Sequence, residues 1–330
     1  MKKIYTAFLI LTALLLQSCD NSRYIMLSGY AQGGTYSVKI SMNGVTEDDS
    51  VIQATVDSLL VLIDNTLSGY NKGSLLSRMN AGEDVETNDM FRDIYAKSRQ
   101  IWKDTDGAVD VASGPLFDAW GFGFKTDSLP SQDEVERILG ACGMDRLGDT
   151  LDESMALHPQ LNFNAIAQGY SCDIIADYLH SIGVKDMLVD IGEIYCEGLN
   201  PSGKPWSIGV DNPVDGNNTP GAELKGIWQS DGGGHGVVTS GNYRKFYVKD
   251  GKKYAHTIDP RTGYPVSHNL LSATIIAPDA TTADALATYC MVIGLDESKE
   301  FILGRPELEA YLIYDNDGAM DTWASPGFFR

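Results

Sequence analysis

The sequence predicts an α+β fold in which mixed, largely antiparallel sheets pack against helices. Segments with helical and with strand-like patterns are unevenly segregated and do not alternate as β–α–β units, which argues against a parallel sheet. Several strand-like segments reverse direction at short polar turns, as antiparallel hairpins do. No internal repeat is apparent at the roughly 20–50-residue periods of repeat proteins. No linker divides residues 29–330, so we expect them to form one body.

The N-terminal half predicts one strand followed by four helices. Polar and apolar residues alternate over 30–42, which is typical of a strand. Apolar residues recur at three- and four-residue spacing over 48–67, after an acidic start, and over 87–107, which ends at a glycine. A shorter helix is expected over 131–143, where a Ser and a Glu stand in capping-box register. The last helix, 165–184, opens with small residues and ends near a glycine.

The C-terminal half predicts mainly hairpins. The segment 186–199 has two apolar runs around a Gly-Glu pair, and 237–260 has two around the sequence KDGK, in which Asp-Gly favours a tight turn. A strand over 272–278 leads into a helix that begins at residue 281. A last hairpin is expected over 310–320, so antiparallel pairing dominates this half.

Length and charge limit the classes of function. The 330 residues suffice for one large or two ordinary domains with a substantial core. The 25 basic and 45 acidic side chains give a formal net charge of −20, which argues against a nucleic-acid partner because phosphate neutralisation needs clustered Lys and Arg. Anionic ligands remain compatible with this charge, since backbone N–H groups and bound cations act locally.

The first residues predict a lipoprotein signal peptide over 1–18. Two lysines precede the apolar stretch 4–16, which is too short to span a bilayer comfortably. The following letters, LQSC, resemble the bacterial lipobox, in which the cysteine becomes the lipidated first residue. We therefore expect Cys19 to carry acyl chains that hold the protein to membrane lipid, with 19–28 as a tether. An uncleaved anchor or a plain export signal stays open.

The same segment predicts the location of the protein. Asp20, directly after the lipidated cysteine, resembles the inner-membrane retention signal of some bacteria. We expect a lipid-anchored protein of the bacterial cell envelope that faces the periplasm, with the inner membrane favoured over the outer. Four cysteines remain in the mature chain, and their apolar or small-residue contexts favour buried free thiols over disulfides.

The segment TTADALATYC, residues 281–290, supports two interpretations. Thr281 and Asp284 have the spacing of a capping box, with the acid in the first helical turn. Asp284 and Thr288 stand four apart and therefore project from one face of the helix, where their oxygens could hold a metal. Taken alone, the segment favours the cap.

Three other stretches concentrate glycine and polar side chains. The stretch 106–123 combines glycines with Trp120, which offers a stacking face for a ligand, although a loop plugged by aromatic rings is the favoured reading in isolation. At 161–173, Asn162, Asn164 and Gln168 stand at the mouth of a helix with small residues in its first turn, which indicates either an anion site or a cap by Asn164.

The third stretch lies between 240 and 263 and favours a functional role. A turn, DPRTG, directly follows a His-Thr pair, which is an unusual concentration of polar groups. Its candidate residues are Ser240, Tyr243, Arg244, His256, Asp259 and Arg261.

Seven motifs together resemble the ApbE family of FAD:protein FMN transferases and occur in the family's order. They are GGTYSVKI, SGYNKGSLLSRMN, TDGAVDVASGPLFDAWGFG, LNFNAIAQGYSCD, VVTSGNYRKF, HTIDPRTGYPV and TTADALATYCMVIG, over roughly residues 29–315. The resemblance implies a catalytic domain over 29–330 with Mg²⁺ and FAD in one site. It also implies transfer of FMN from FAD to a Ser or Thr hydroxyl of an exported flavoprotein, a redox-complex subunit, with release of AMP. Two alternatives stay open: an FAD pyrophosphatase that yields FMN and AMP, and a non-catalytic flavin-binding lipoprotein.

The resemblance also implies site residues. By motif, the metal ligands are the backbone carbonyl of Ala165 and the side chains of Asp284 and Thr288. The positions that contact FAD are Gly33, Tyr70, Ala119, Trp120, Gly121, Asn162, Gln168 and Ile258. The catalytic residues are Asp284 and His256, the latter as proton acceptor for the incoming hydroxyl.

This chain departs from the family's pattern at three of these motif positions. Asn162 and Gln168 stand where the family usually has Asp and Lys, and Asn242 stands where Asp is common. The amides keep hydrogen-bonding capacity but remove the charges. Flavin binding remains the expectation, whereas the balance between transfer and hydrolysis stays open.

Overall fold

A computed structural model gives the fold of the chain. It describes residues 23–122, 129–157, 160–214, 217, 219, 221–242, 246–249, 252–255 and 257–329, with no side chains for 246–249 and 252–255. The predicted signal peptide, Cys19 and His256 lie outside the described residues.

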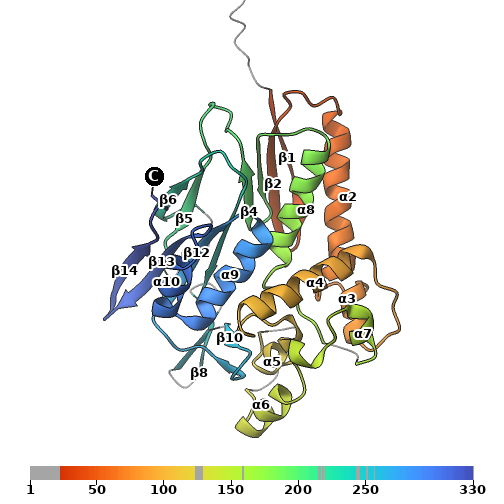
Figure 1. Cartoon of the computed structure of the whole chain (residues 1–330), viewed down its shortest axis with the longest axis vertical. Helices are drawn as coiled ribbons and strands as arrows, with labels where there is room; N and C mark the ends of the chain where they lie inside the picture. The colour runs from red at the N-terminus through yellow and green to blue at the C-terminus, as the bar shows by residue number, and fades with distance from the viewer. Residues whose placement is uncertain are drawn as a thin grey trace, which may run out of the picture.

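An antiparallel sheet of eight strands forms the centre of the molecule (Figure 1). Its order is β1 (Tyr24–Ala31), β2 (Gly34–Ser41), β3 (Met187–Asp190), β4 (Ile194–Glu197), β7 (His235–Gly241), β12 (Leu270–Ala277), β13 (Glu309–Asn316) and β14 (Ala319–Ala324). All neighbouring strands in this sheet pair antiparallel, which confirms the predicted fold class.

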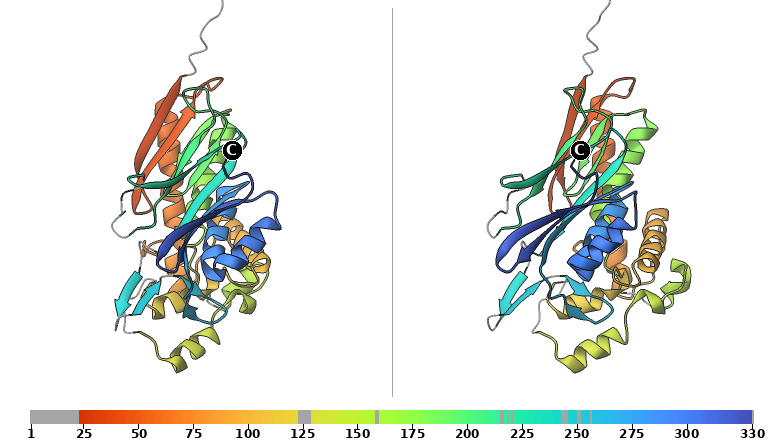
Figure 2. Two further views of the ribbon diagram at one scale, coloured as in Figure 1. Left: turned by 90° about the vertical axis from the view of Figure 1, so that its left-hand side faces the viewer. Right: turned by 60° about the vertical axis from the view of Figure 1, so that its left-hand side comes forward.

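Helices cover one face of this sheet, as the turned views in Figure 2 show. Nine α-helices occur in the described part of the chain: α2 (Asp49–Leu67), α3 (Leu75–Asn80), α4 (Asp89–Asp104), α5 (Gly114–Ala119), α6 (Gln132–Leu139), α7 (Leu151–Met155), α8 (Ala167–Ser181), α9 (Ala280–Ile293) and α10 (Leu295–Leu303). Helix α9 packs on β7 and β12, and α8 packs on β3 and β4. The start of each of these two helices therefore lies near the middle of the sheet (Figure 1).

Three two-stranded ribbons complete the fold. They are β5 (Ser207–Asp211) with β6 (Leu224–Gln229), β8 (Phe246–Lys249) with β9 (Lys252–Ala255), and β10 (Ile258–Asp259) with β11 (Tyr264–Pro265). Strands β8 and β9 pair Lys249 with Lys252, the two lysines of the KDGK sequence, whose central residues lie outside the described residues. The β5–β6 ribbon was not predicted, and it buries Trp206 and Trp228 in an apolar cluster together with Tyr311 and Phe328.

Local capping confirms several helix predictions. The Asp48 side chain accepts a hydrogen bond from the Ser50 N–H at the start of α2, and Ser131 accepts one from Glu134 N–H at the start of α6. The predicted helices over 48–67, 87–107, 131–143 and 165–184 correspond to α2, α4, α6 and α8. The predicted hairpins over 186–199 and 310–320 correspond to β3–β4 and β13–β14.

The predicted strand over 30–42 is wrong in one respect, because it is part of a hairpin. Strand β1 begins at Tyr24, within the expected tether, and the chain reverses at Gln32 and Gly33, which have φ angles of 50° and 82°. Two successive residues in the left-handed region form the tight turn that joins twisted antiparallel strands. Exposure alternates along β1, since Met26 and Tyr30 are exposed and Leu27 between them is buried, so β1 is a half-buried strand whose outward face carries apolar side chains.

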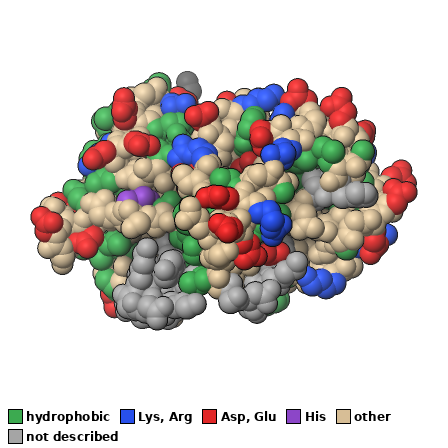
Figure 3. Space-filling view, turned by 90° about the horizontal axis from the view of Figure 1, so that it is seen from below, with side chains coloured by type: hydrophobic (Ala, Val, Ile, Leu, Met, Phe, Trp, Pro, Cys, Tyr) green, Lys and Arg blue, Asp and Glu red, His purple; other side chains and the backbone are tan. Residues whose placement is uncertain are grey.

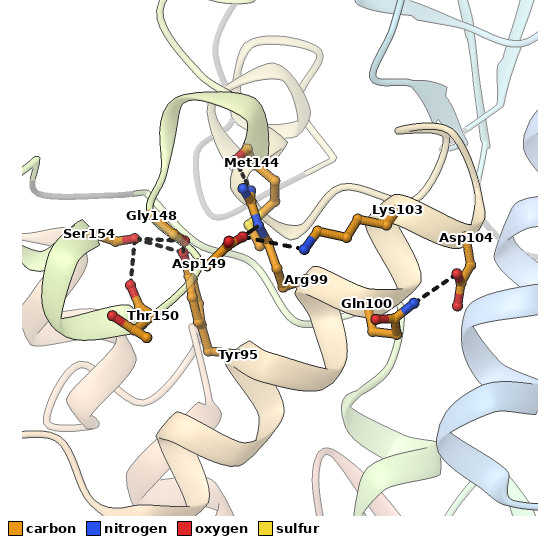
Figure 4. Close-up of polar contacts among 10 residues, drawn as sticks. All are labelled: Tyr95, Arg99, Gln100, Lys103, Asp104, Met144, Gly148, Asp149, Thr150 and Ser154. Atoms are coloured by element: carbon orange, nitrogen blue, oxygen red, sulfur yellow. Dashed lines mark hydrogen bonds and ion pairs between the residues drawn. The ribbon is translucent and has the colours of Figure 1, made fainter.

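The loop between α6 and α7 is fastened to α4 (Figure 4). Arg99 and Lys103 both pair with Asp149, at 3.1 and 3.3 Å, and the Tyr95 hydroxyl donates to the Gly148 carbonyl at 2.8 Å. On the face drawn in Figure 3, acidic and basic side chains are interspersed.

Candidate functional site

The predicted site residues converge on a cavity of about 320 Å³, which we call the central cavity. It lies between the start of α8, the middle of α9 and the loops that flank them. Seven residues that the sequence singled out for ligand or metal line this cavity: Tyr70, Asn162, Ala165, Gln168, Ile258, Asp284 and Thr288. The fold therefore brings together side chains that are far apart in the sequence.

Two further cavities adjoin the central one and share no lining residue with each other. The first, which we call the Gly33 cavity, has about 470 Å³, contains Gly33 in its wall, and shares Tyr70, Asn164 and Gln168 with the central cavity. The second, the Asp110 cavity, has about 520 Å³ and shares Asp110 and Pro260 with the central cavity. The three cavities form a series with the central one in the middle.

The aromatic stretch supplies the central cavity with different rings from the one predicted. Ala119, Trp120 and Gly121 do not line any of the three cavities. The Trp120 ring is buried, and its indole N–H donates to the Gly263 carbonyl at 2.8 Å. Its neighbours Phe117 and Phe122 line the central cavity.

Helix α9 does not begin as the sequence suggested. Its cap is Asp279, whose side chain accepts from the Thr282 N–H at 2.7 Å. The capping box of Thr281 and Asp284 is therefore wrong, and Asp284 stands in the second helical turn, where its side chain is not needed by its own helix.

Asp284 instead accepts a hydrogen bond from the other helix. Its Oδ2 atom accepts from the Gly169 N–H of α8 at 3.0 Å. A Cβ atom at position 169 would lie 2.1 Å from the Ala280 carbonyl oxygen and 2.8 Å from the Asp284 Cβ. Glycine thus permits the close crossing of α8 and α9, which puts the buried Asp284 carboxylate beside the first turn of α8.

Burial controls the protonation of this carboxylate. It raises the pKa of Asp284 to about 8, the negative charge of Asp173 acts in the same direction, and the Gly169 hydrogen bond opposes both. At neutral pH the carboxyl therefore favours its protonated form in the protein without a metal. A cation bound there would favour the ionised form.

The donor atoms around Asp284 fit a hard cation. Within the described residues, Asp284 Oδ1 has no hydrogen-bond partner, and the Thr288 side chain one turn further along α9 faces the same cavity as Ala165. No group of three or more His, Cys, Asp and Glu residues that could hold a metal occurs in the described part of the chain. One carboxylate, one hydroxyl and one carbonyl suit Mg²⁺, which takes few protein oxygens and keeps places for water and phosphate.

The two amides that replace the family's charged pair are held by the backbone. Asn162 Oδ1 accepts from the Asn164 N–H at 2.9 Å, and Gln168 Nε2 donates to the Ile191 carbonyl at 3.1 Å. Helix α8 follows Ile166 and has no side-chain cap, so the interpretation of Asn164 as its cap is wrong. Tyr70 is largely exposed at the wall that the central and Gly33 cavities share, where its ring offers a stacking surface.

The remaining residues that the sequence singled out lie in different parts of the molecule. Ser240 lines the central cavity, whereas Arg261 lines the Asp110 cavity and pairs with Asp259 at 3.0 Å. Tyr243, Arg244 and His256 lie outside the described residues. The described cysteines, Cys142, Cys172, Cys196 and Cys290, are free thiols, as predicted, and all but Cys142 are buried.

Sequence reasoning missed Gly169 and Asp173. A glycine inside a helix costs about 1 kcal/mol relative to alanine, so it signals a close approach of another backbone. Asp173 stands four residues after Gly169, on the same face of α8. This spacing could have indicated that both residues contact the same neighbouring element.

Comparison with known proteins relates nearly the whole chain to one family. Residues 33–312 match the family model described as "ApbE family". An FAD:protein FMN transferase of Haemophilus influenzae is 32% identical over 99% of this chain and 98% of its own length. One from Escherichia coli K12 is 34% identical over 80% of this chain and 77% of its own length.

Solved structures extend this similarity to the fold. The flavin transferase ApbE from Vibrio cholerae aligns with a TM-score of 0.78 at 30% identity, over 93% of this chain and 98% of that one. The apo form of the Pseudomonas stutzeri flavinyl transferase ApbE aligns with a TM-score of 0.79 at 32% identity, over 93% of this chain and 96% of that one.

Proposed function

The chain belongs to the ApbE family and is a flavin transferase, and from this premise we propose that it moves FMN from FAD to a Ser or Thr hydroxyl of an exported flavoprotein. In this reaction the hydroxyl oxygen forms a bond to the phosphorus of the FMN half of FAD. The bond from that phosphorus to the bridging oxygen breaks, AMP leaves with this oxygen, and the hydroxyl proton is released. The acceptor is a subunit of a redox complex in this proposal.

One observation carries the proposal. The three candidate metal ligands, Ala165, Asp284 and Thr288, line the same cavity as the candidate flavin contacts Tyr70 and Gln168. A cation at Asp284 would therefore lie beside whatever diphosphate the flavin contacts hold. The resident Mg²⁺ would supply neutralisation of the charge that develops on the phosphate oxygens.

The series of cavities suggests how two substrates reach one phosphorus atom. FAD is too large for about 320 Å³ alone, and the neighbouring Gly33 cavity offers about 470 Å³ more across the wall formed by Tyr70 and Gln168. Phosphoryl transfer brings the nucleophile in line with the leaving group, on opposite sides of the phosphorus. We assign FAD to the central and Gly33 cavities, and the approach of the acceptor to the Asp110 cavity, beyond Asp110 and Pro260.

The residues around the diphosphate act by binding and orientation. The N–H groups at the start of α8 favour negative charge, and the Gln168 side chain is held near them by the Ile191 carbonyl. Phe117 and Phe122 exclude water from the central cavity. His256, in this proposal, accepts the proton of the attacking hydroxyl. A lipid anchor at Cys19 would hold the enzyme at the envelope membrane, where exported acceptors are found.

The decisive experiment incubates the full-length protein with FAD, Mg²⁺ and a candidate exported flavoprotein. Mass spectrometry of the acceptor and chromatography of the nucleotides should show covalent FMN and AMP in equal amounts. FMN released at the same rate without acceptor would instead favour an FAD pyrophosphatase. FAD that stays bound and intact at every Mg²⁺ concentration would favour a flavin-binding lipoprotein.

A further inference from the structure

Helices α8 and α9 each carry a carboxyl side chain that accepts hydrogen bonds from backbone N–H groups at the start of the other helix. Asp173, in the second turn of α8, accepts hydrogen bonds from the first two N–H groups of α9, those of Ala280 and Thr281, both at 2.8 Å. It also accepts from the Thr281 hydroxyl. In return, Asp284 of α9 accepts from the Gly169 N–H of α8. Each helix therefore supplies a carboxyl group that accepts from backbone N–H at the start of the other helix.

These reciprocal hydrogen bonds fix the position of α9 along its own axis. The two carboxylates form ties at separate points along the crossing, and Gly169 allows the Ala280 carbonyl to approach to within contact distance. On the opposite side, a Cβ at Gly236 of β7 would lie 2.4 Å from the Ala280 Cα, so β7 also presses on the first turn of α9. Sliding or rotating α9 would break at least one of these contacts.

The position of α9 decides where two candidate metal ligands point. Asp284 and Thr288 both belong to α9, whereas Ala165 precedes α8. The three donors converge on one cavity only while the two helices keep their relative position. A rearrangement of about 1 Å would be roughly half of the 2.0–2.1 Å ligand distance that Mg²⁺ demands, so it would take a ligand out of coordinating range.

We propose that Asp173 is a positioning residue for the cation site: it holds the start of α9 against α8 so that Asp284 and Thr288 face the Ala165 carbonyl. This inference rests on the proposed Mg²⁺-dependent function. Asp173 is largely buried, does not line the central cavity, and acts through α9 rather than on the cation. Residues that orient metal ligands in this way typically change metal affinity by about tenfold to a hundredfold when they are replaced.

The chain offers a matched control for this role. Asp279 caps the same helix end, accepting from the N–H and the hydroxyl of Thr282 at 2.7 and 2.8 Å. It precedes α9 directly, and within the described part of the chain its side chain makes no hydrogen bond to α8. Replacing either aspartate by alanine removes a cap worth about 0.5–2 kcal/mol of stability. Only the loss of Asp173 also removes hydrogen bonds that join α9 to α8.

The test measures cation binding directly. Mn²⁺, which takes the same oxygen ligands as Mg²⁺, is titrated into the full-length protein and followed by electron paramagnetic resonance. FAD affinity is measured separately by quenching of flavin fluorescence. We expect Asp173→Ala to weaken Mn²⁺ binding by about tenfold or more while FAD affinity changes by less than about threefold. Asp279→Ala should leave Mn²⁺ affinity within about twofold of the wild type, and Asp173→Asn, which keeps one acceptor oxygen, should lie between.

Equal Mn²⁺ affinities in Asp173→Ala and Asp279→Ala would overturn the proposal, because both would then act only as caps. If Asp173→Ala does not fold, Thr281→Val replaces it, since it removes one bond to Asp173 at nearly constant volume. An unchanged Mn²⁺ affinity in Thr281→Val and Asp173→Asn would count against the role equally. Asp284→Ala separates the two levels of inference: if it binds Mn²⁺ like the wild type, the metal assignment itself fails.

Discussion

Replacing Gly169 by alanine tests the helix crossing on which the site depends, because two principles predict opposite signs. Helix propensity alone favours alanine inside a helix by about 1 kcal/mol. The crossing predicts the reverse, since the new Cβ would lie 2.1 Å from the Ala280 carbonyl oxygen and Cβ atoms essentially never approach closer than 3.0 Å. The helices would have to separate by at least 0.9 Å, the difference between these two distances.

The magnitude follows from two costs and one gain. Overpacking of this kind costs about 1–3 kcal/mol. The same separation would stretch the 3.0 Å bond from Gly169 N to Asp284 Oδ2 beyond hydrogen-bonding range, which costs about 1–3 kcal/mol. After the gain in helix propensity, we expect Gly169→Ala to lower the free energy of unfolding by about 1–5 kcal/mol. Misplacing Asp284 by about 1 Å should also lower metal-dependent FAD cleavage by about a hundredfold.

Urea unfolding followed by circular dichroism and the release of AMP from FAD measure the two effects. Gly304→Ala is the matched control: it stands at the end of α10 with a helical φ of −77°, and a Cβ there meets its nearest atom at an ordinary 3.6 Å. This control should be neutral or slightly stabilising. A Gly169→Ala protein as stable and as active as the wild type would refute the close crossing.

Three further predictions use other parts of the molecule. In the presence of a chelator, unfolding free energy should fall as pH rises from about 4 towards 8, because the native state keeps a proton on Asp284, whose pKa is raised to about 8, after the unfolded state has lost it. Asp284→Asn should reduce this slope in denaturant titrations, leaving the part due to Asp173, whose pKa burial raises to about 6, and should abolish metal-dependent turnover; a slope equal to that of the wild type would contradict the assignment. Leu139→Trp, which fills the Asp110 cavity from α6, should raise the KM for the acceptor protein several-fold and leave the KM for FAD unchanged in steady-state assays; the opposite split would place FAD in that cavity. A thiol reagent at pH 8 should label only Cys142 of the four described cysteines in the native protein, and slowly, because burial raises the pKa of its thiol to about 11; counting labelled thiols with and without urea checks this.

Features set by neighbouring residues were predictable from the sequence. Asp48 and Ser131 cap their helices through bonds within three residues, and β8 pairs with β9 in the register expected on either side of an Asp-Gly pair. The metal and flavin positions came from the resemblance to the family, and the structure gathers most of them around one cavity. Their roles remain predictions.

Features set by distant residues were not predictable in this way. Thr281 looked like a cap because Glu or Asp three residues later usually completes one, but its hydroxyl is engaged by Asp173, which is 108 positions away. Trp120 looked like a stacking surface, but a turn 143 residues later accepts its indole N–H and buries the ring. The pattern around a residue gives its local capacity for contacts, whereas the partner that uses this capacity is chosen by the fold.

The same reasoning explains why one aspartate can serve both the fold and the chemistry. Asp284 uses one carboxylate oxygen to bind the Gly169 N–H, and among the described residues its other oxygen has no hydrogen-bond partner beside the cavity. Burial favours the neutral carboxyl, while the Gly169 bond and a bound cation both favour the ionised form. Cation binding at Asp284, as proposed, would therefore strengthen the bond that ties α9 to α8, and a tight helix crossing would in turn hold the carboxylate in place for the cation. Because the two equilibria would share one group, a change at the crossing that displaces Asp284 should weaken cation binding, and removal of the cation should loosen the crossing by the same free energy.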